Sequence, residues 1–159
     1  MFMIPFRAEG KTRLGDSRLA AAMLEDVKAA AAGAVVIDAP GGQGPAVGAA
    51  LAAVRGPVTI VNSDLPCVTA AELEQLSAAA PALVAAGDGT TNALALRDAR
   101  DFAPLYGPGS AARFEHHLEA TRLDLPGLRD DVDTWDDLER VRDRVGANTR
   151  AYLDSLVPA

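Results

Sequence analysis

Short apolar runs alternate with helical segments through the first half of the chain, and this alternation constrains the fold most. Residues 1–6 (MFMIPF), 34–39 (AVVIDA) and 58–61 (VTIV) are typical of β-strands, and we interpret 34–39 as a compact buried strand. Helices are predicted between them, over 17–32 after a cap at Asp16 and over 46–55. A strand–helix–strand order predicts a mostly parallel sheet with helices on both faces.

The second half continues this pattern with a mixed tail. Thr69 and Glu72 form a capping box that opens a helix ending near Pro81, and Thr134 caps a final pair of helices that splits near Gly146. The other expected elements are strands at 82–86 and 92–96, a helix at 111–120 and a short strand at 122–125. No repeat or linker interrupts the 159 residues, so we expect a single domain over 1–159.

Charge and cysteine content narrow the class of protein. The net charge of −7 argues against a nucleic-acid backbone or an anionic membrane as the main partner. The single cysteine, Cys67, excludes an intrachain disulfide, and no apolar run approaches the roughly 20 residues of a membrane span. The N-terminal MFMIPFRAEGK is too short and too soon charged for a signal peptide, so we expect a cytoplasmic protein.

Two loops that follow the first two strands are candidates for nucleotide binding, because ligands of parallel sheets collect at the carboxyl ends of strands. Arg7, Lys11 and Arg13 in the first loop could bind phosphate together with backbone amides, or form a solvated basic loop. The spacing GxxxxGK[ST] of a Walker A motif is absent. The second loop, Gly41–Pro45 with Gly44, lets a base or ribose approach the backbone, although a plain turn has the same composition.

Aspartates in two later loops are candidate metal ligands. Asp64 ends the run TIVNSD, and a carboxylate there suits a hard cation such as Mg²⁺, or serves as a turn or capping residue. Since Thr69 already caps the next helix, Asp64 has no evident structural role. Asp131 and Asp133 alternate, so on an extended segment they share a face, where two carboxylates repel each other unless a cation lies between them.

Several motifs in this order resemble one known family. Pro5 with KTRL (11–14), SDLPCVT (63–69), GTTNAL (89–94), YGPGS (106–110) and DVDTWDDL (131–138) resemble the guanylyltransferases that use 2-phospho-L-lactate or phosphoenolpyruvate in coenzyme F420 biosynthesis. These belong to the wider nucleotidyltransferase group that includes the molybdenum cofactor guanylyltransferases. The resemblance covers nearly the whole chain. It implies a Rossmann-like, three-layer α/β/α nucleotidyltransferase fold of GT-A type with a mostly parallel mixed sheet.

The resemblance also implies a reaction and its residues. A phosphorylated three-carbon acid attacks the α-phosphorus of GTP, with Mg²⁺ as cofactor, and pyrophosphate leaves. GTP and this small acid are the implied partners. Assembly into a homodimer is compatible with the resemblance but is not fixed by it. By motif, Lys11 and Arg13 hold the GTP phosphates, Asp64, Asp133 and Asp131 bind Mg²⁺, and the acceptor-binding residues are Thr91, Gly107 and Ser110.

Three features depart from the family pattern. The chain is shorter between the first helix and the Gly41 turn, which implies the loss of an edge element. The turn GGQGPAVGAAL is closer to the GPxxG turn of the molybdenum cofactor enzymes, which leaves the base and the acceptor open. The family's GTGTN is contracted to GTTN, so either Thr90 or Thr91 takes the family role. The alternatives are therefore a nucleotidyltransferase for molybdopterin or a sugar phosphate, and a non-catalytic nucleotide-binding homologue.

Overall fold

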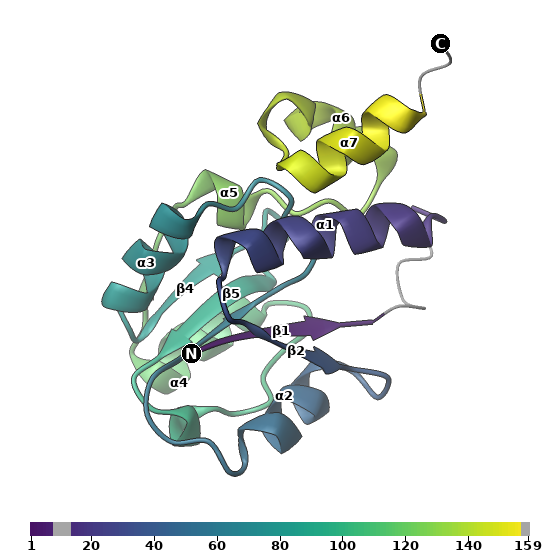
Figure 1. The fold of residues 1–159 in the computed structure, drawn as a ribbon. Coiled ribbons are helices and arrows are strands. Elements are labelled where there is room, and N and C mark those ends of the chain that lie inside the picture. Colours follow the sequence, from purple (N-terminus) through teal and green to yellow (C-terminus); the bar gives the residue numbers. More distant parts are fainter. Residues whose placement is uncertain (8–13, 157–159) are drawn as a thin grey trace.

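The computed structural model describes residues 1–7 and 14–156. Figure 1 shows its helices and strands along the chain. They are β1 (Phe2–Phe6), α1 (Ser17–Ala30), β2 (Val35–Asp38), α2 (Gln43–Leu51), β3 (Val58–Val61), α3 (Ala70–Ala78), β4 (Ala82–Ala85), β5 (Thr91–Leu96), α4 (Ser110–Leu118), β6 (Thr121–Arg122), α5 (Pro126–Arg129), α6 (Trp135–Val141) and α7 (Ala147–Ser155), with 3₁₀ turns at Ala99–Asp101 and Arg142–Arg144.

The strands form one mixed sheet in the order β2-β1-β3-β5-β4-β6. β1 runs parallel to β2 and β3, and β4 runs parallel to β6, whereas β5 is antiparallel to both of its neighbours. The predicted mostly parallel sheet is therefore confirmed. The reversed direction of β5 brings its first residues to the sheet edge where β1, β2 and β3 end.

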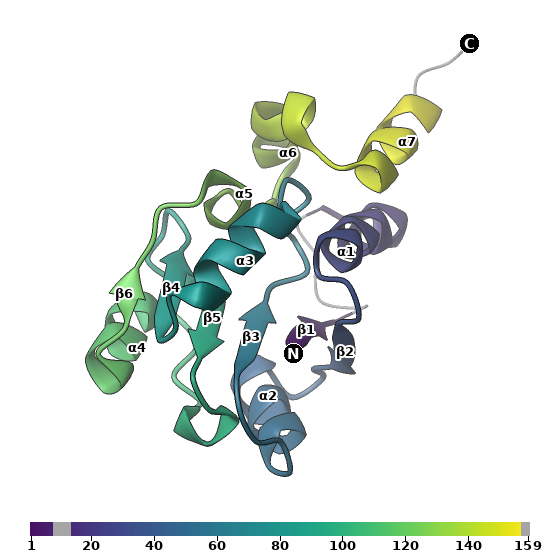
Figure 2. The ribbon, with the colours of Figure 1, turned by 60° about the vertical axis from the view of Figure 1, so that its left-hand side comes forward.

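Helices cover both faces of the sheet, as the alternation predicts (Figures 1 and 2). Helices α1, α3 and α5 pack on one face through a cluster that includes Val27, Leu73 and Leu128. Helices α2 and α4 pack on the other face through Val47 and Phe114. The result is a three-layer α/β/α fold. In the part of the chain that the structure describes, no helix has the length and apolar character needed to cross a membrane.

A third apolar cluster attaches α6 and α7 to α1 and so fixes the segment that precedes α6. The carboxylate of Asp26 in α1 is 5% exposed and accepts hydrogen bonds from the backbone N–H groups of Asn148 (2.8 Å) and Thr149 (2.9 Å). It thereby caps the amino end of α7. A Cβ on Gly146 would lie 2.4 Å from Asp26 Cγ, so this close approach requires glycine.

The expectation of a compact buried strand at 34–39 is wrong. Strand β2 lies at the end of the strand order, next to β1, and Val35 and Val36 are 47% and 39% exposed. The helices cover β2 only partly at this edge of the sheet. By contrast, all four residues of the central strand β3 are buried. An apolar run has the same pattern in a central strand and in an edge strand, so the sequence could not distinguish the two positions.

Candidate active site

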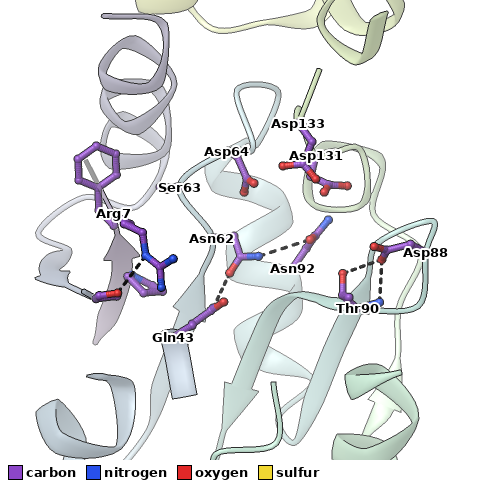
Figure 3. A pocket seen from close by; sticks show the side chains of 13 residues that line it. Arg7, Gln43, Asn62, Ser63, Asp64, Asp88, Thr90, Asn92, Asp131 and Asp133 are labelled. Atoms are coloured by element: carbon purple, nitrogen blue, oxygen red, sulfur yellow. Dashed lines mark hydrogen bonds between the residues drawn. The ribbon is translucent and has the colours of Figure 1, made fainter. Parts of the chain in front are cut away.

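A cavity of about 350 Å³ opens at the sheet edge where β1, β2 and β3 end and β5 begins (Figure 3). This size suits a small-molecule ligand. Its lining comes from segments far apart in the sequence. The described lining residues are Pro5, Phe6, Arg7, Ala39, Gln43, Asn62, Ser63, Asp64, Asp88, Thr90, Asn92, Asp131 and Asp133.

Asp64 reaches the cavity because β3 ends three residues before it and the chain then turns into the core. The side chain of Leu65 is buried, and Asp64 itself is 7% exposed. The backbone carbonyl of Asp64 accepts a hydrogen bond of 3.0 Å from the N–H of Val132. This bond joins the end of β3 to the distant segment that carries the other two aspartates.

Alternation places Asp131 and Asp133 on the cavity side of their segment. Val132 between them is fully buried in the cluster of α1, α6 and α7. The segment is fixed at its end by the capping box of Thr134, in which Asp137 Oδ2 accepts from the N–H of Thr134 (2.9 Å) and of Asp133 (3.2 Å). The predicted shared face is confirmed, and its reason is the burial of Val132.

The three carboxylates converge. Asp64, Asp131 and Asp133 each offer an oxygen that lies within 4.8 Å of the other two (Figure 3). Burial is the largest cause that raises the pKa of Asp131 to about 6, and the charges of Asp64 and Asp133 add to it. We call these three residues the carboxylate wall. Oxygen donors in this arrangement suit a hard divalent cation.

A guanidinium lies across the cavity from the carboxylate wall. Arg7 directly follows β1, and its Nε donates a hydrogen bond of 3.2 Å to the carbonyl of Ala39, at the end of β2 (Figure 3). The predicted phosphate-binding residues Lys11 and Arg13 lie outside the described residues. The described geometry thus provides one cationic side and one acidic side of a single cavity.

The other predicted binding residues that the structure describes do not line the cavity. The hydroxyls of Thr91 and Ser110 are buried and hydrogen-bond each other at 2.9 Å. Gly44 is buried against Pro104, where a Cβ would lie 3.2 Å from the Pro104 Cβ, and Gly107 has a φ of +112°. Their roles in binding stay predictions.

Sequence reasoning named Thr90 only as an alternative to Thr91, and it missed Asp88 and Asn92, which also line the cavity. Asp88 and Thr90 belong to the turn before β5, where the Asp88 carboxylate accepts from the Thr90 N–H (2.9 Å) and hydroxyl (2.7 Å). Asn92 lies in β5 itself. The rule about carboxyl ends of strands could not identify them, because they reach this edge at the amino end of an antiparallel strand.

Comparisons with known proteins agree with the resemblance in the sequence. No family model matches the chain. The chain is 39% identical over 161 residues to a phosphoenolpyruvate guanylyltransferase of Thermomonospora curvata. This alignment covers 91% of the chain and 67% of that protein. The chain is 44% identical over 123 residues to one of Nocardia farcinica, covering 68% and 53%. The chain therefore spans about half to two thirds of the length of these curated relatives.

A solved structure supports the fold. A protein from Desulfovibrio desulfuricans, assigned as a nucleotide-diphospho-sugar transferase, superposes with a TM-score of 0.74 over 97% of this chain and 93% of its own. The two sequences are 17% identical, so the likeness concerns the fold alone. This supports the expected nucleotidyltransferase-type architecture.

Proposed function

Because the chain belongs to the phosphoenolpyruvate guanylyltransferase family, we propose that it joins GMP from GTP to a phosphorylated three-carbon acid. The acceptor is phosphoenolpyruvate or 2-phospho-L-lactate, pyrophosphate is released, and the reaction belongs to coenzyme F420 biosynthesis in the cytoplasm. An oxygen of the acceptor phosphate forms a bond to the α-phosphorus of GTP. The bond from that phosphorus to the bridging oxygen of the β-phosphate breaks, and pyrophosphate carries away the electron pair.

One observation carries the proposal, namely the convergence of the carboxylate wall opposite Arg7. Carboxylates from two segments more than sixty residues apart lie within 4.8 Å of one another in one cavity. Like charges placed so close together are unfavourable in a fold that needs only stability, and they are typical of a functional site. A cationic side chain across the same cavity suits a triphosphate.

The donor set of the carboxylate wall fits Mg²⁺, which prefers carboxylate oxygens. Asp64, Asp131 and Asp133 would hold it. A bound Mg²⁺ would supply positive charge that offsets the charge on the α-phosphate and on the departing pyrophosphate. The oxygen of the acceptor phosphate is already anionic near neutral pH, so the reaction requires no strong general base.

The chain's own groups then bind and orient two anions. Arg7, Lys11 and Arg13 bind the phosphates of GTP, and the glycine-rich segment 41–45 with Gly44, at the amino end of α2, contacts the nucleoside. The acceptor lies near the start of β5 and α4, where backbone amides around Thr91, Gly107 and Ser110 orient it. Positioning and electrostatic stabilisation account for the rate enhancement. Thr90 lines the described cavity and is the better placed of the two threonines for a hydroxyl contact.

The direct test is identification of the product. Incubation of the protein with GTP, Mg²⁺ and each acid in turn should release pyrophosphate, and mass spectrometry should detect the GMP adduct of one acid. A panel with molybdopterin, sugar phosphates and the other nucleoside triphosphates tests the alternative acceptors and bases. If GTP binds but no acceptor supports pyrophosphate release, the protein is a non-catalytic nucleotide-binding homologue and the proposal is wrong.

Nucleotide binding has its own test in the first loop. Lys11→Ala should weaken GTP affinity by about tenfold, because one charge-assisted contact to phosphate is lost. Calorimetric titration with GTP measures this. Lys28→Ala is a matched control, since the Lys28 ammonium pairs with Glu25 on the exposed face of α1. Equal GTP affinity of the Lys11 variant and the wild type would remove Lys11 from the site.

A further inference from the structure

Three side-chain amides form a hydrogen-bonded row along the floor of the cavity. Gln43 Nε2 donates to Asn62 Oδ1 at 2.7 Å, and Asn62 Nδ2 lies 3.5 Å from Asn92 Oδ1 (Figure 3). The row crosses from the first turn of α2 through the end of β3 to the second residue of β5. We call these residues the amide row. It runs from the amino end of α2 to the carboxylate wall.

Asn92 ends the row beside the carboxylate wall, and its polar atoms are engaged there. The side chain is 2% exposed. Its Nδ2 donates to the backbone carbonyl of Arg129 at 3.0 Å, and the same NH₂ group points toward the carboxylate of Asp131 (Figure 3). Because the Arg129 carbonyl only accepts, the NH₂ group of Asn92 must face it, and the Oδ1 of Asn92 must face Asn62.

Backbone carbonyls fix the direction of the whole row. Asn62 Nδ2 donates to the carbonyl of Thr91 at 3.3 Å as well as facing Asn92 Oδ1. The Asn62 Oδ1 is therefore left to accept from Gln43 Nε2. Two carbonyls that can only accept, those of Thr91 and Arg129, thus set the orientation of the row and leave one arrangement for Asn92. Its NH₂ group is held toward Asp131.

We propose that Asn92 is a positioning residue that holds the carboxylate of Asp131 toward Asp64 and Asp133, with Asn62 and Gln43 fixing Asn92 in turn. This inference rests on the cation site of the proposed function. Side chains that hydrogen-bond metal ligands set the direction of those ligands, and their loss typically lowers metal affinity by about 10–100-fold. The amide row therefore tunes cation binding through residues that need not touch the cation.

A purely structural role makes a different prediction. The Asn92 bond to the Arg129 carbonyl also ties β5 to the end of α5, so loss of Asn92 could lower stability alone. The two roles separate in their dependence on Asp131. A positioning effect requires the Asp131 carboxylate, whereas a structural effect is the same with or without it.

The test measures Mn²⁺ affinity by calorimetry, which does not depend on turnover. Asn92→Leu keeps the number and branching of the side-chain heavy atoms while removing the hydrogen bonds, and should weaken Mn²⁺ binding at least about tenfold. In an Asp131→Asn background the same change should have little further effect. Gln75→Ala, on the exposed face of α3, is the control and should bind like the wild type. Thermal unfolding of each variant reports its stability.

Each outcome decides the inference. Unchanged Mn²⁺ affinity in folded Asn92→Leu, or an equal loss in both backgrounds, would overturn it. If Asn92→Leu does not fold, Asn62→Leu decides instead, because it leaves the Arg129 contact intact and should still weaken Mn²⁺ binding, though less. If the wild type makes the GMP adduct but Asn92→Leu binds Mn²⁺ normally, this inference is wrong while the proposed function stands. A wild type that binds no Mn²⁺ would refute the cation site of the proposed function.

Discussion

Two polar clusters, each made of predicted site residues, differ in how their polar groups are satisfied. The carboxylate wall gathers three like charges at the cavity, and burial together with the neighbouring charges raises the pKa of Asp131 to about 6. The Thr91–Ser110 pair is fully buried, and its two hydroxyls satisfy each other at 2.9 Å. A fold selected for stability alone favours the second arrangement and disfavours the first. The wall therefore indicates function and the pair indicates packing.

The largest expected effect is in the carboxylate wall. Asp64→Ala should remove metal-dependent turnover, lowering kcat/KM by about a hundredfold to a thousandfold, because loss of a ligand takes several kcal/mol from the stabilisation of charge in the transition state. Pyrophosphate release measures the rate. Circular dichroism should show the fold intact. Normal pyrophosphate release by this variant would remove the carboxylate wall from the reaction.

Substitution in the buried Thr91–Ser110 pair should change the stability of the protein rather than its activity. Thr91→Val leaves the Ser110 hydroxyl buried with its partner gone, which should lower the free energy of unfolding by about 1–3 kcal/mol. Denaturant titration measures this, and kcat/KM should change by less than about tenfold. Thr90→Val is the matched control for stability alone, since its hydroxyl bonds Asp88 in an exposed turn. A large loss in kcat/KM for the acceptor with unchanged stability would instead give the Thr91 hydroxyl the family's acceptor role.

Charge removal from the wall should stabilise the protein. The pKa of Asp131 in the folded state, about 6, is above its ordinary value, so the stability linked to its protonated form is lost as pH rises through 6. Asp131→Asn should thus raise the free energy of unfolding at pH 8 by about 1 kcal/mol, after allowance for solvent screening, with no gain below about pH 4. Denaturant titrations with a metal chelator present test this. A gain that is equal at pH 4 and pH 8 would contradict the electrostatic cause.

Local signals in the sequence were enough for several parts of this fold and site. The capping box at Thr69 and the helix cap at Thr134 form as predicted, because each joins groups only three residues apart. The alternation that points Asp131 and Asp133 to one side also depends on neighbouring residues alone. Asp64 was found because a polar residue directly after an apolar strand lies at the sheet edge.

Other features depended on which segments pack together. The reversed direction of β5 carries Thr90 and Asn92 to the cavity and turns the Thr91 hydroxyl toward Ser110. The exposure of β2 follows from its place at the end of the strand order.

The sequence by itself therefore determined the alternating elements, their caps and the aspartates at their ends, because these follow from contacts within one turn or one strand. The order and direction of the strands, and with them the meeting of Asp64 with Asp131 and Asp133 and the amide row beneath them, were decided by the tertiary structure. The reason is physical: strand neighbours are chosen by burial and hydrogen bonding between segments many residues apart, which no local pattern encodes.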